Sequence, residues 1–504
     1  MIKTLQQAPF LRLSVFYIAG ILVSNWTESF AIPLLGVFLL FSSFLIILFS
    51  SSAYRLRWLF GAGFCLFLFS TGLLLTEIEK QKTDWNEPEV QKKYLAEIID
   101  EPVRKPKTWL CLSRIEGKKV NLYISADNIS VSLQPGDSIC FYGELQPIDL
   151  NYLKKKGIAA RGFVSSTNWK RTGCRHSFSL RYEALSVRKE VLRQLKQIIV
   201  EEDSYIIASA LLTGYKDELT PDLRRIFIVT GSSHVLAVSG FHFSVIYGMI
   251  YFFLIILGNS PKARIFQQAI ILLIMWFYAF LTGLEPSIIR AALMLSLWGI
   301  GNAFFLRAFT LNTLGVAALG MLLYNPFYLF DISFQLSFGA VLSILLINPH
   351  LLSLYQSRNL LLKYCWQSTS ITISAQIGTL PFCLFYFHQF SLTFLITNLF
   401  AVPLSGVLLF LLPFSLFVHQ VFPGLILLNH ISNWTLHLFI SGLRSMESIP
   451  NGLIEGINFS LVDSLLMVFY FIAFTFFLIR KRIFYFCLGL LFVTLQVFHY
   501  FCFS

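Results

Sequence analysis

Three hydrophilic side chains that could do chemistry interrupt an otherwise apolar stretch near the middle of the chain. They are His234, Ser239 and His242, with Gly240 among them. Lipid offers such groups no hydrogen-bond partner, so a helix that only crossed the bilayer would not carry them. The apolar run 233–257 predicts one continuous helix, on which the two imidazoles share a face. We expect this face to line a bundle interior or a water-filled path.

The same spacing argues against a metal centre. Eight residues of helix place the imidazoles about two turns apart, which is too far for one zinc ion unless the helix breaks. The sequence also contains no Cys-x-x-Cys and no His-Glu-x-x-His pattern. We therefore predict no metal, no catalytic residue and no cofactor.

Charged and amide side chains continue this polar trail through later apolar stretches. Arg290 follows Pro286 by one turn, and a charge at mid-helix costs roughly 2.5–3.5 kcal/mol on insertion scales. It is therefore either a counter-charge for an anionic solute or a structural group, in an ion pair or reaching the headgroups. Asp331 is either a helix N-cap or the partner of Arg290, and Gln335 shares its face. The candidate lining residues are His234, Ser239, His242, Arg290, Asp331, Gln335, Ser337 and Gln376.

Composition places these residues in a membrane protein. Of the 504 residues, 56% are hydrophobic and 13% are charged, and the mean hydropathy is +0.68; soluble domains are about a quarter charged. The net charge of +12 fits Lys and Arg collected in cytoplasmic loops, and it also fits a polyanionic partner. Arg55 and Arg57 then lie in the cytoplasm, and the third apolar stretch emerges on the opposite side.

One polar block separates the apolar stretches, and it predicts a small β domain. Short strands near 95–100, 107–116, 118–125, 138–146 and 159–166 are divided by turn signals such as Pro135-Gly136-Asp137. The predicted fold class is a polytopic α-helical membrane protein with one inserted small β-barrel of OB type. The predicted domains are N-terminal transmembrane helices (1–76), an extracytoplasmic OB-like domain (77–176), amphipathic interfacial helices (177–230) and a transmembrane domain (231–504).

Basic and aromatic side chains accompany the predicted barrel. OB barrels often bind single-stranded nucleic acid by combining a basic groove with stacking aromatic rings. The alternative is a solvated charged face on a barrel whose aromatic residues form the core. The candidates for strand binding are Lys154, Lys155, Lys156, Arg161, Lys170, Arg171, Tyr142 and Trp169. Cys111, Cys140 and Cys174 lie in the same block, where two of them could pair outside the cytoplasm or all could stay as single thiols.

Three blocks carry a family resemblance. The first is GYKDELTPDLRRIFIVTGSSHVLAVSGFHFSVI, the second contains Pro286, Ser287, Arg290 and Ala291, and the third is NPFYLFDISFQLSF at 325–338. Together they resemble the ComEC family, the inner-membrane channel proteins of natural DNA uptake. In the first block the chain keeps the family's glycines, histidines and serine, and it has Val235 where the family prefers Leu.

The resemblance implies transport of single-stranded DNA across the cytoplasmic membrane during natural transformation. It implies an extracytoplasmic DNA receptor and a cytoplasmic ATPase as partners beside the lipid bilayer, because the chain has no Gly-x-x-x-x-Gly-Lys-[Ser/Thr] loop. It does not extend to the family's metallo-β-lactamase-like domain, whose His-x-His-x-Asp-His cluster is missing from this sequence. We therefore expect no enzyme activity, and a separate nuclease stays an open alternative. The oligomeric state is not determined by the sequence.

Two rival functions are left open. A secondary transporter for a small anion would also use broken helices with polar groups near the membrane midplane, but it has no need of a β domain. A membrane-embedded hydrolase would use the two histidines and would lose activity when either is replaced by alanine.

Overall fold

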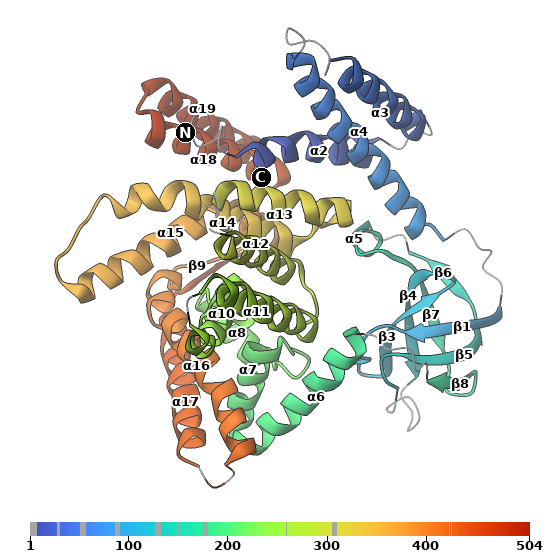
Figure 1. The fold of residues 1–504 in the computed structure, drawn as a ribbon, viewed down its shortest axis with the longest axis vertical. Coiled ribbons are helices and arrows are strands. Elements are labelled where there is room, and N and C mark those ends of the chain that lie inside the picture. Colours follow the sequence, from blue (N-terminus) through green and yellow to red (C-terminus); the bar gives the residue numbers. More distant parts are fainter. Residues whose placement is uncertain are drawn as a thin grey trace. The chain divides into compact units, whose positions relative to one another are not determined.

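The computed structural model describes residues 8–27, 31–50, 57–85, 91–125, 133–148, 151–174, 180–258, 260–304, 310–422, 424 and 426–503. The chain forms two compact units (Figure 1). The helical unit contains Met1–Ala8, Arg188–Ala317 and Ile332–Ser504, and the β-containing unit contains Pro9–Val187 and Ala318–Asp331. Two of the basic residues expected in cytoplasmic loops, at positions 55 and 307, lie outside the described residues.

The β-containing unit begins with three apolar helices, α2 (Pro9–Trp26), α3 (Ala31–Ser50) and α4 (Arg57–Thr83). Helices α2 and α4 cross where both carry glycine. A Cβ added at Gly20 would lie 2.2 Å from the carbonyl oxygen of Phe69, and one added at Gly72 would lie 2.5 Å from that of Tyr17. Small residues allow such close approach of two backbones, which is a common way to pack helices in membranes.

The sheet of this unit confirms the predicted strands and adds three more. Its strands are β1 (Lys92–Ile98), β2 (Val103–Arg104), β3 (Thr108–Ile115), β4 (Lys118–Ser125), β5 (Asp137–Gly143), β6 (Leu145–Pro147), β7 (Ile158–Val164) and β8 (Trp169–Cys174), with the short helix α5 (Asn151–Lys155) before β7. Their order is β6-β7-β4-β3-β1-β5-β8, with β2 beside β3. All pairings are antiparallel except β4 with β7. Within the described strands no ladder joins the two ends of this order, so closure into an OB-type barrel stays a prediction.

Alternation along the strands explains why this sheet has a core. In β7 the residues Ile158, Ala160, Gly162 and Val164 are buried, while Arg161 and Phe163 are exposed. The period of two sends every second side chain inward. Ile98, Cys111, Leu122, Ile139 and Phe141, each at most 1% exposed, come together in the same core.

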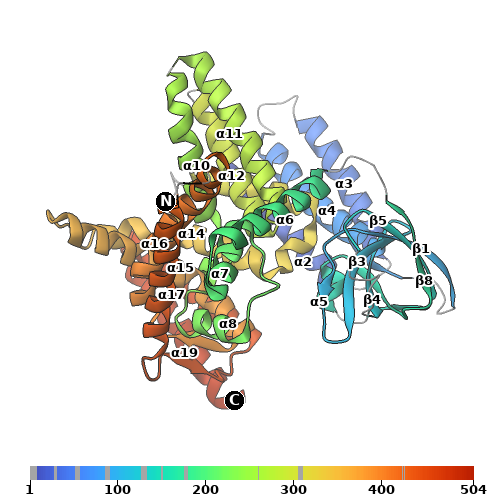
Figure 2. The same cartoon turned by 90° about the horizontal axis from the view of Figure 1, so that it is seen from below.

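The helical unit is a bundle that starts with the amphipathic helix α6. Its helices are α6 (Leu180–Ile198, whose first turns belong to the other unit), α7 (Glu202–Thr213), α8 (Pro221–Val229), α9 (Ser233–Leu236), α10 (Gly240–Leu254), α11 (Pro261–Leu281), α12 (Pro286–Ala303), α13 (Thr310–Tyr324), α14 (Ile332–Leu352), α15 (Leu360–Phe387), α16 (Phe394–Val421), α17 (Leu427–Glu447), α18 (Leu461–Arg480) and α19 (Ile483–Phe503). Helices α10, α11 and α12 pack on one another (Figure 2).

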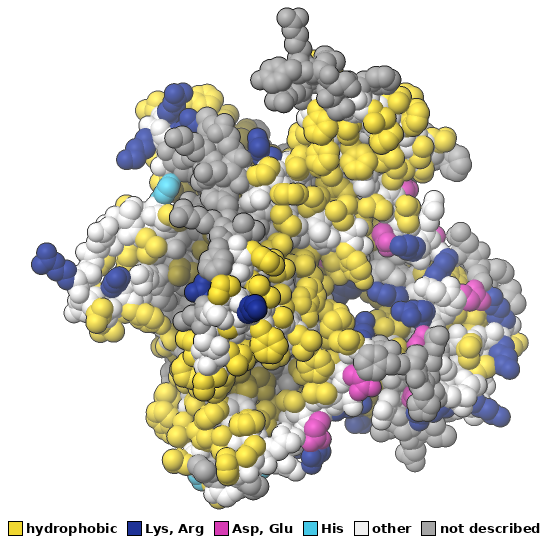
Figure 3. All heavy atoms as spheres, viewed as in Figure 1, with side chains coloured by type: hydrophobic (Ala, Val, Ile, Leu, Met, Phe, Trp, Pro, Cys, Tyr) yellow, Lys and Arg dark blue, Asp and Glu magenta, His cyan; other side chains and the backbone are white. Residues whose placement is uncertain are grey.

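Length and polarity of the helices fit a multi-pass membrane protein. Among the described residues, eight helices are long and apolar enough to cross a bilayer, two of them in the β-containing unit. Hydrophobic side chains cover much of the visible surface of the helices, whereas Lys and Arg gather on the strands of the β domain (Figure 3). A bundle whose outer surface is apolar is stable when lipid covers it.

Helices α14 and α15 approach each other as closely as α2 and α4 do. A Cβ added at Gly378 would lie 2.3 Å from the carbonyl oxygen of Gly339 and 2.6 Å from the Cβ of Ser343. One turn further along α14, the Ser343 hydroxyl donates to the carbonyl oxygen of Ser374 over 2.6 Å. This contact positions α14, the helix that carries Gln335 and Ser337.

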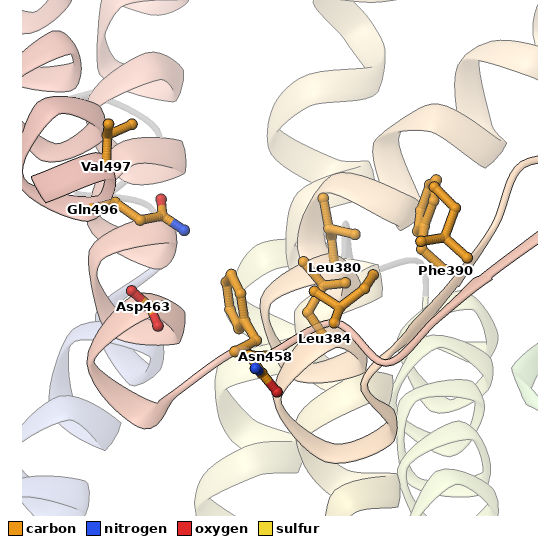
Figure 4. A pocket seen from close by; sticks show the side chains of 10 residues that line it. Leu380, Leu384, Phe390, Asn458, Asp463, Gln496 and Val497 are labelled. Atoms are coloured by element: carbon orange, nitrogen blue, oxygen red, sulfur yellow. The ribbon is translucent and has the colours of Figure 1, made fainter. Parts of the chain in front are cut away.

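A two-stranded sheet lies among these helices and separates two cavities. It pairs β9 (Gln389–Ser391) with β10 (Leu453–Glu455) in antiparallel register. On one side Phe390 and Ile454 line a cavity of about 550 Å³ with α15, α18 and α19, as Figure 4 shows for Phe390, Leu380 and Leu384. On the other side Gln389, Leu453 and Glu455 line a cavity of about 530 Å³ with α8. Successive residues of a strand point to opposite faces, so one short sheet serves both cavities.

Candidate functional site

The apolar run that predicts one helix over 233–257 is broken in the structure. Helix α9 ends at Leu236, and α10 begins at Gly240. Ala237 and Ser239 have extended backbones, with ψ of 124° and 175°. The prediction of a continuous helix is therefore wrong, and the break leaves the carbonyl of Val238 outside any helix. That carbonyl accepts a hydrogen bond of 3.2 Å from the hydroxyl of Ser287, at the start of α12.

His242 closes the first turn of α10. Its Nδ1 accepts from the backbone N–H of Ser239 over 3.3 Å and lies 3.0 Å from the Ser239 hydroxyl. An Nδ1 that accepts a backbone hydrogen bond leaves the proton of a neutral imidazole on Nε2. The His242 side chain is 1% exposed, and its Nε2 has no hydrogen-bond partner of standard geometry among the described residues. Nε2 nevertheless faces the backbone carbonyl of Val235, in a contact that falls short of standard hydrogen-bond geometry.

Arg290 lies directly beside this helix start. A Cβ added at Gly240 would lie 2.9 Å from Nη2 of Arg290, so the guanidinium packs directly against the start of α10. Its Nη1 donates to the carbonyl oxygen of Ser337 on α14, and its Cζ lies 6.0 Å from the centre of the Phe338 ring. The side chain is 6% exposed, and its Nε has no partner. In the described part of the chain, no carboxylate forms an ion pair with it.

Further cationic groups surround the break. Lys216, after α7, pairs with Glu285, before α12, at 3.4 Å, and both are about one-third exposed. Lys216 and His234 are each close enough to His242 for their charges to interact. The imidazole of His234 is exposed, yet burial among protein atoms lowers its pKa and the carbonyl of Gly231 partly opposes this.

The arrangement is suited to hold an oxyanion. Two imidazoles, one ammonium and one guanidinium lie around the break between α9 and α10, and the ammonium pairs with the carboxylate of Glu285. Buried donors without acceptors are rare because each costs about 1–3 kcal/mol. Among the described residues Nε of Arg290 is such a donor, and an anionic oxygen would satisfy it.

A family model described as competence protein matches residues 211–482, which is more than half of the chain and includes the whole cluster. The chain belongs to the competence protein family.

Two relatives are similar to about half of this chain. Over 231 residues, 46% of this chain and 28% of the relative, the sequence is 31% identical to ComE operon protein 3 of Bacillus subtilis (strain 168). Over 254 residues, 49% of this chain and 56% of the relative, it is 32% identical to an uncharacterized protein of Aquifex aeolicus (strain VF5). The matched region covers less than two thirds of the length of either relative. No solved structure matches this competence-family chain.

The remaining predicted lining residues lie on α14 and α15 or directly before α14. Gln335 on α14 and Gln376 on α15 are half-buried, and Ser337 takes part through its backbone carbonyl. Asp331 directly precedes α14 with an extended backbone (ψ 130°), which is the position and conformation of an N-cap. Its pairing with Arg290 stays a prediction, because the two residues belong to different units.

The predicted strand-binding residues of the β domain divide into three groups. Tyr142, Lys156, Arg161 and Lys170 are exposed, and Lys154 is half-buried. Two of the predicted cations make structural contacts instead. Arg171 pairs with the buried carboxylate of Asp137 at 2.6 Å, and Lys155 lies 4.2 Å from the centre of the Phe330 ring, where burial lowers its pKa.

Trp169 corrects the prediction. It is 7% exposed and packs in the core of the sheet with Phe141 and Tyr94. A ring enclosed by the core cannot stack on a base at the surface, so the structural alternative holds for this residue. Cys111 and Cys140 are free thiols, and the side chain of Cys174 lies outside the described residues.

Sequence reasoning missed three groups that the structure brings into these sites. Tyr123 on β4 stacks on Phe163 of β7 with ring centres 5.0 Å apart, and Phe163 is 64% exposed. Asn121 and Arg161 form a pair two residues earlier in the same ladder. Side chains two residues apart on a strand point to the same face, so the guanidinium lies on the face of the stack. Alternation along β4 could have identified Tyr123. Lys216 and Glu285 carry no comparable local signal, since they lie 69 residues apart and meet only in the fold.

Proposed function

We propose that this protein passes single-stranded DNA across the cytoplasmic membrane during natural transformation. The observation that carries the proposal is the buried guanidinium of Arg290 beside the α9–α10 break, which no carboxylate of the described residues pairs with, in a chain of the competence family. ComE operon protein 3, a relative over nearly half the chain, is named for a competence operon. Transport agrees with this family better than catalysis does.

A phosphate backbone needs a path with few but well-placed cations. Each phosphate carries a full charge, so an apolar path would exclude it. A dense row of arginines would hold the strand too tightly for release, by the logic that limits ion channels. The cluster of His234, His242, Lys216 and Arg290 offers two permanent charges and two neutral imidazole donors, a moderate attraction. Broken helices at such sites occur where the backbone lines a cavity.

The distribution of charge supports a position of the cluster on the outer side of the membrane. The α10–α11 and α18–α19 connections contain Lys262 with Arg264 and Arg480-Lys481-Arg482, which the positive-inside rule places in the cytoplasm. The α9–α10 break lies at the opposite end of α10, and Glu285 lies in the next connection on that same side. The β domain follows α4, whose start carries Arg57, and is therefore also extracytoplasmic.

The β domain supplies a second surface that a single DNA strand could bind. The exposed stack of Tyr123 and Phe163 beside Arg161 combines an aromatic platform with a cation, as single-strand binders do. Movement of DNA in one direction needs an energy source, so the proposal includes a cytoplasmic ATPase and an extracytoplasmic DNA receptor as partners.

The test is transformation of a deletion strain that is complemented with variants. We expect the deletion to abolish transformants while DNA still binds to the cell surface, and the wild-type gene to restore them. Arg290→Met keeps an unbranched apolar stem but removes the charged guanidinium, and we expect it to restore less than a tenth of the transformants. Arg358→Gln removes an exposed charge from the same unit and should restore them fully. Equal membrane abundance of the variants is checked by immunoblot. Normal transformation in the deletion strain would refute the proposed function.

A further inference from the structure

The cavity of about 530 Å³ between α8 and the β9–β10 sheet has a basic wall that the cluster at the α9–α10 break does not use. Pro221, Arg224, Arg225 and Ile228 of α8 line it, and their spacing of three, four and seven residues places them on one face of the helix. Gln389 and Glu455 face them from the sheet, which is open to solvent on this side.

Both arginines are available for a ligand. Arg224 and Arg225 are exposed, and within the described residues neither guanidinium forms an ion pair or a hydrogen bond. Glu455 lines the same cavity without pairing with either guanidinium, so the cavity keeps a net positive charge. Arginine side chains match phosphate oxygens in geometry and charge, and adjacent arginines can contact two successive groups of a chain.

Contacts within the protein fix the position of α8 in the absence of a ligand. At the end of α8 the carbonyl oxygen of Val229 accepts 2.7 Å and 3.3 Å hydrogen bonds from the hydroxyls of Ser391 and Thr393. These bonds connect α8, which carries the arginines, to β9 in the opposite wall of the cavity. Inside the helix, Leu223, Ile226 and Phe227 are at most 2% exposed and belong to the core of the helical unit. A preformed site binds without the cost of ordering loops.

We propose that this cavity binds the phosphodiester backbone of a single DNA strand before the strand reaches the α9–α10 break. This inference rests on the proposed function and deepens it. Only three residues, Thr230 to Ser232, separate α8 from α9, which carries His234. A strand held at Arg224 and Arg225 is therefore presented at the start of the segment that holds the oxyanion cluster. A volume of about 530 Å³ is within the range of pockets that enclose small ligands, which leaves room for a nucleotide unit rather than a single ion.

The experiment measures binding of fluorescein-labelled oligothymidylate to the full chain in nanodiscs, as a function of potassium chloride. The variant is Arg224→Gln with Arg225→Gln. Each phosphate contact to a single strand contributes about 0.7 to the slope of log Kd against log salt, so we expect the slope to fall by about 1.4 and the affinity to fall about tenfold at physiological salt. The control is Arg358→Gln with Lys363→Gln, which removes two exposed charges from the same unit and should change neither value.

Crosslinking from β10 is a second measurement, and it does not depend on charge. Leu453 faces the basic cavity, whereas Ile454 faces the apolar cavity on the other side of the sheet. With a photoactivatable label on Leu453→Cys we expect crosslinks to oligothymidylate, and with the same label on Ile454→Cys we expect none. Equal crosslinking from both positions, or an Arg224/Arg225 variant that binds like its control, would overturn the inference. Vesicles of anionic lipid that compete with the oligonucleotide while crosslinking is absent would assign the cavity to lipid headgroups and would also overturn it.

The two proposals fail in different ways. If the deletion strain transforms normally, the transport function is wrong whatever the cavity binds. If the deletion strain does not transform, but the Arg224→Gln, Arg225→Gln variant restores full transformation and binds DNA with unchanged salt dependence, only the cavity is wrongly assigned.

Discussion

A single added methyl group at Gly378 should destabilise the helical unit. The alanine Cβ would lie 2.3 Å from the carbonyl oxygen of Gly339 and 2.6 Å from the Cβ of Ser343. One of these atoms belongs to the backbone, so no change of rotamer removes the clash and α14 must move away from α15. Forcing extra atoms into a packed contact costs about 1–3 kcal/mol.

Two smaller effects enter the estimate with opposite signs. Separation of the helices also weakens the hydrogen bond from Ser343 to the Ser374 carbonyl, and such bonds in membrane proteins are worth about 0.6 kcal/mol on average. Alanine is a better helix former than glycine by up to about 1 kcal/mol. The net expectation for Gly378→Ala is a loss of about 1–3 kcal/mol, because the helix preference and the hydrogen bond nearly offset each other.

The matched control is Gly248→Ala in α10. Gly248 also lies within an apolar helix, but no atom would lie within 4 Å of its added Cβ. We expect this substitution to be neutral or stabilising. The assay is the midpoint of thermal unfolding of the purified protein in detergent, followed by tryptophan fluorescence. Adding Ser343→Gly to Gly378→Ala removes one of the two clashes and should recover part of the loss. If Gly378→Ala unfolds at the same temperature as Gly248→Ala, the close crossing of α14 and α15 is wrong.

Two further substitutions test the sites themselves. Phe163→Ala removes half of the exposed stack on the β domain, and since stacking is worth about 1–3 kcal/mol per base, we expect at least a fivefold loss of oligothymidylate affinity. Leu95→Ala removes an exposed side chain from β1 and should leave the affinity unchanged; equal losses would count against the stack. His242→Ala removes the acceptor for the Ser239 N–H at the start of α10, and loss of such a cap costs about 0.5–2 kcal/mol. We expect a lower unfolding midpoint than for His430→Ala, which alters an exposed residue of α17, and no difference between the two would contradict the cap.

The sequence by itself determined the class of this protein and most of its elements. Long apolar runs can be stable only in lipid or in a large core, so they predict spans wherever they occur, and eight described helices are long and apolar enough to cross a bilayer. Alternation and turn residues predict the strands of the β domain for the same local reason. The spacing of Gly231, His234, Ser239, Gly240 and His242 carried the family resemblance, which the family match confirms.

Tertiary structure alone decided what the polar residues contact. The apolar run at 233–257 favours one helix, yet the chain breaks it because Ser287 and the Ser239–His242 pair satisfy the freed backbone groups. A guanidinium inside an apolar helix requires compensation, but only the fold shows that Arg290 donates to a backbone carbonyl 47 residues away and not to a described carboxylate. Trp169 is a residue type that often stacks on bases, but the fold places it in the core of the sheet. These contacts join residues far apart in the chain, and local pattern carries no information on distances that only packing sets.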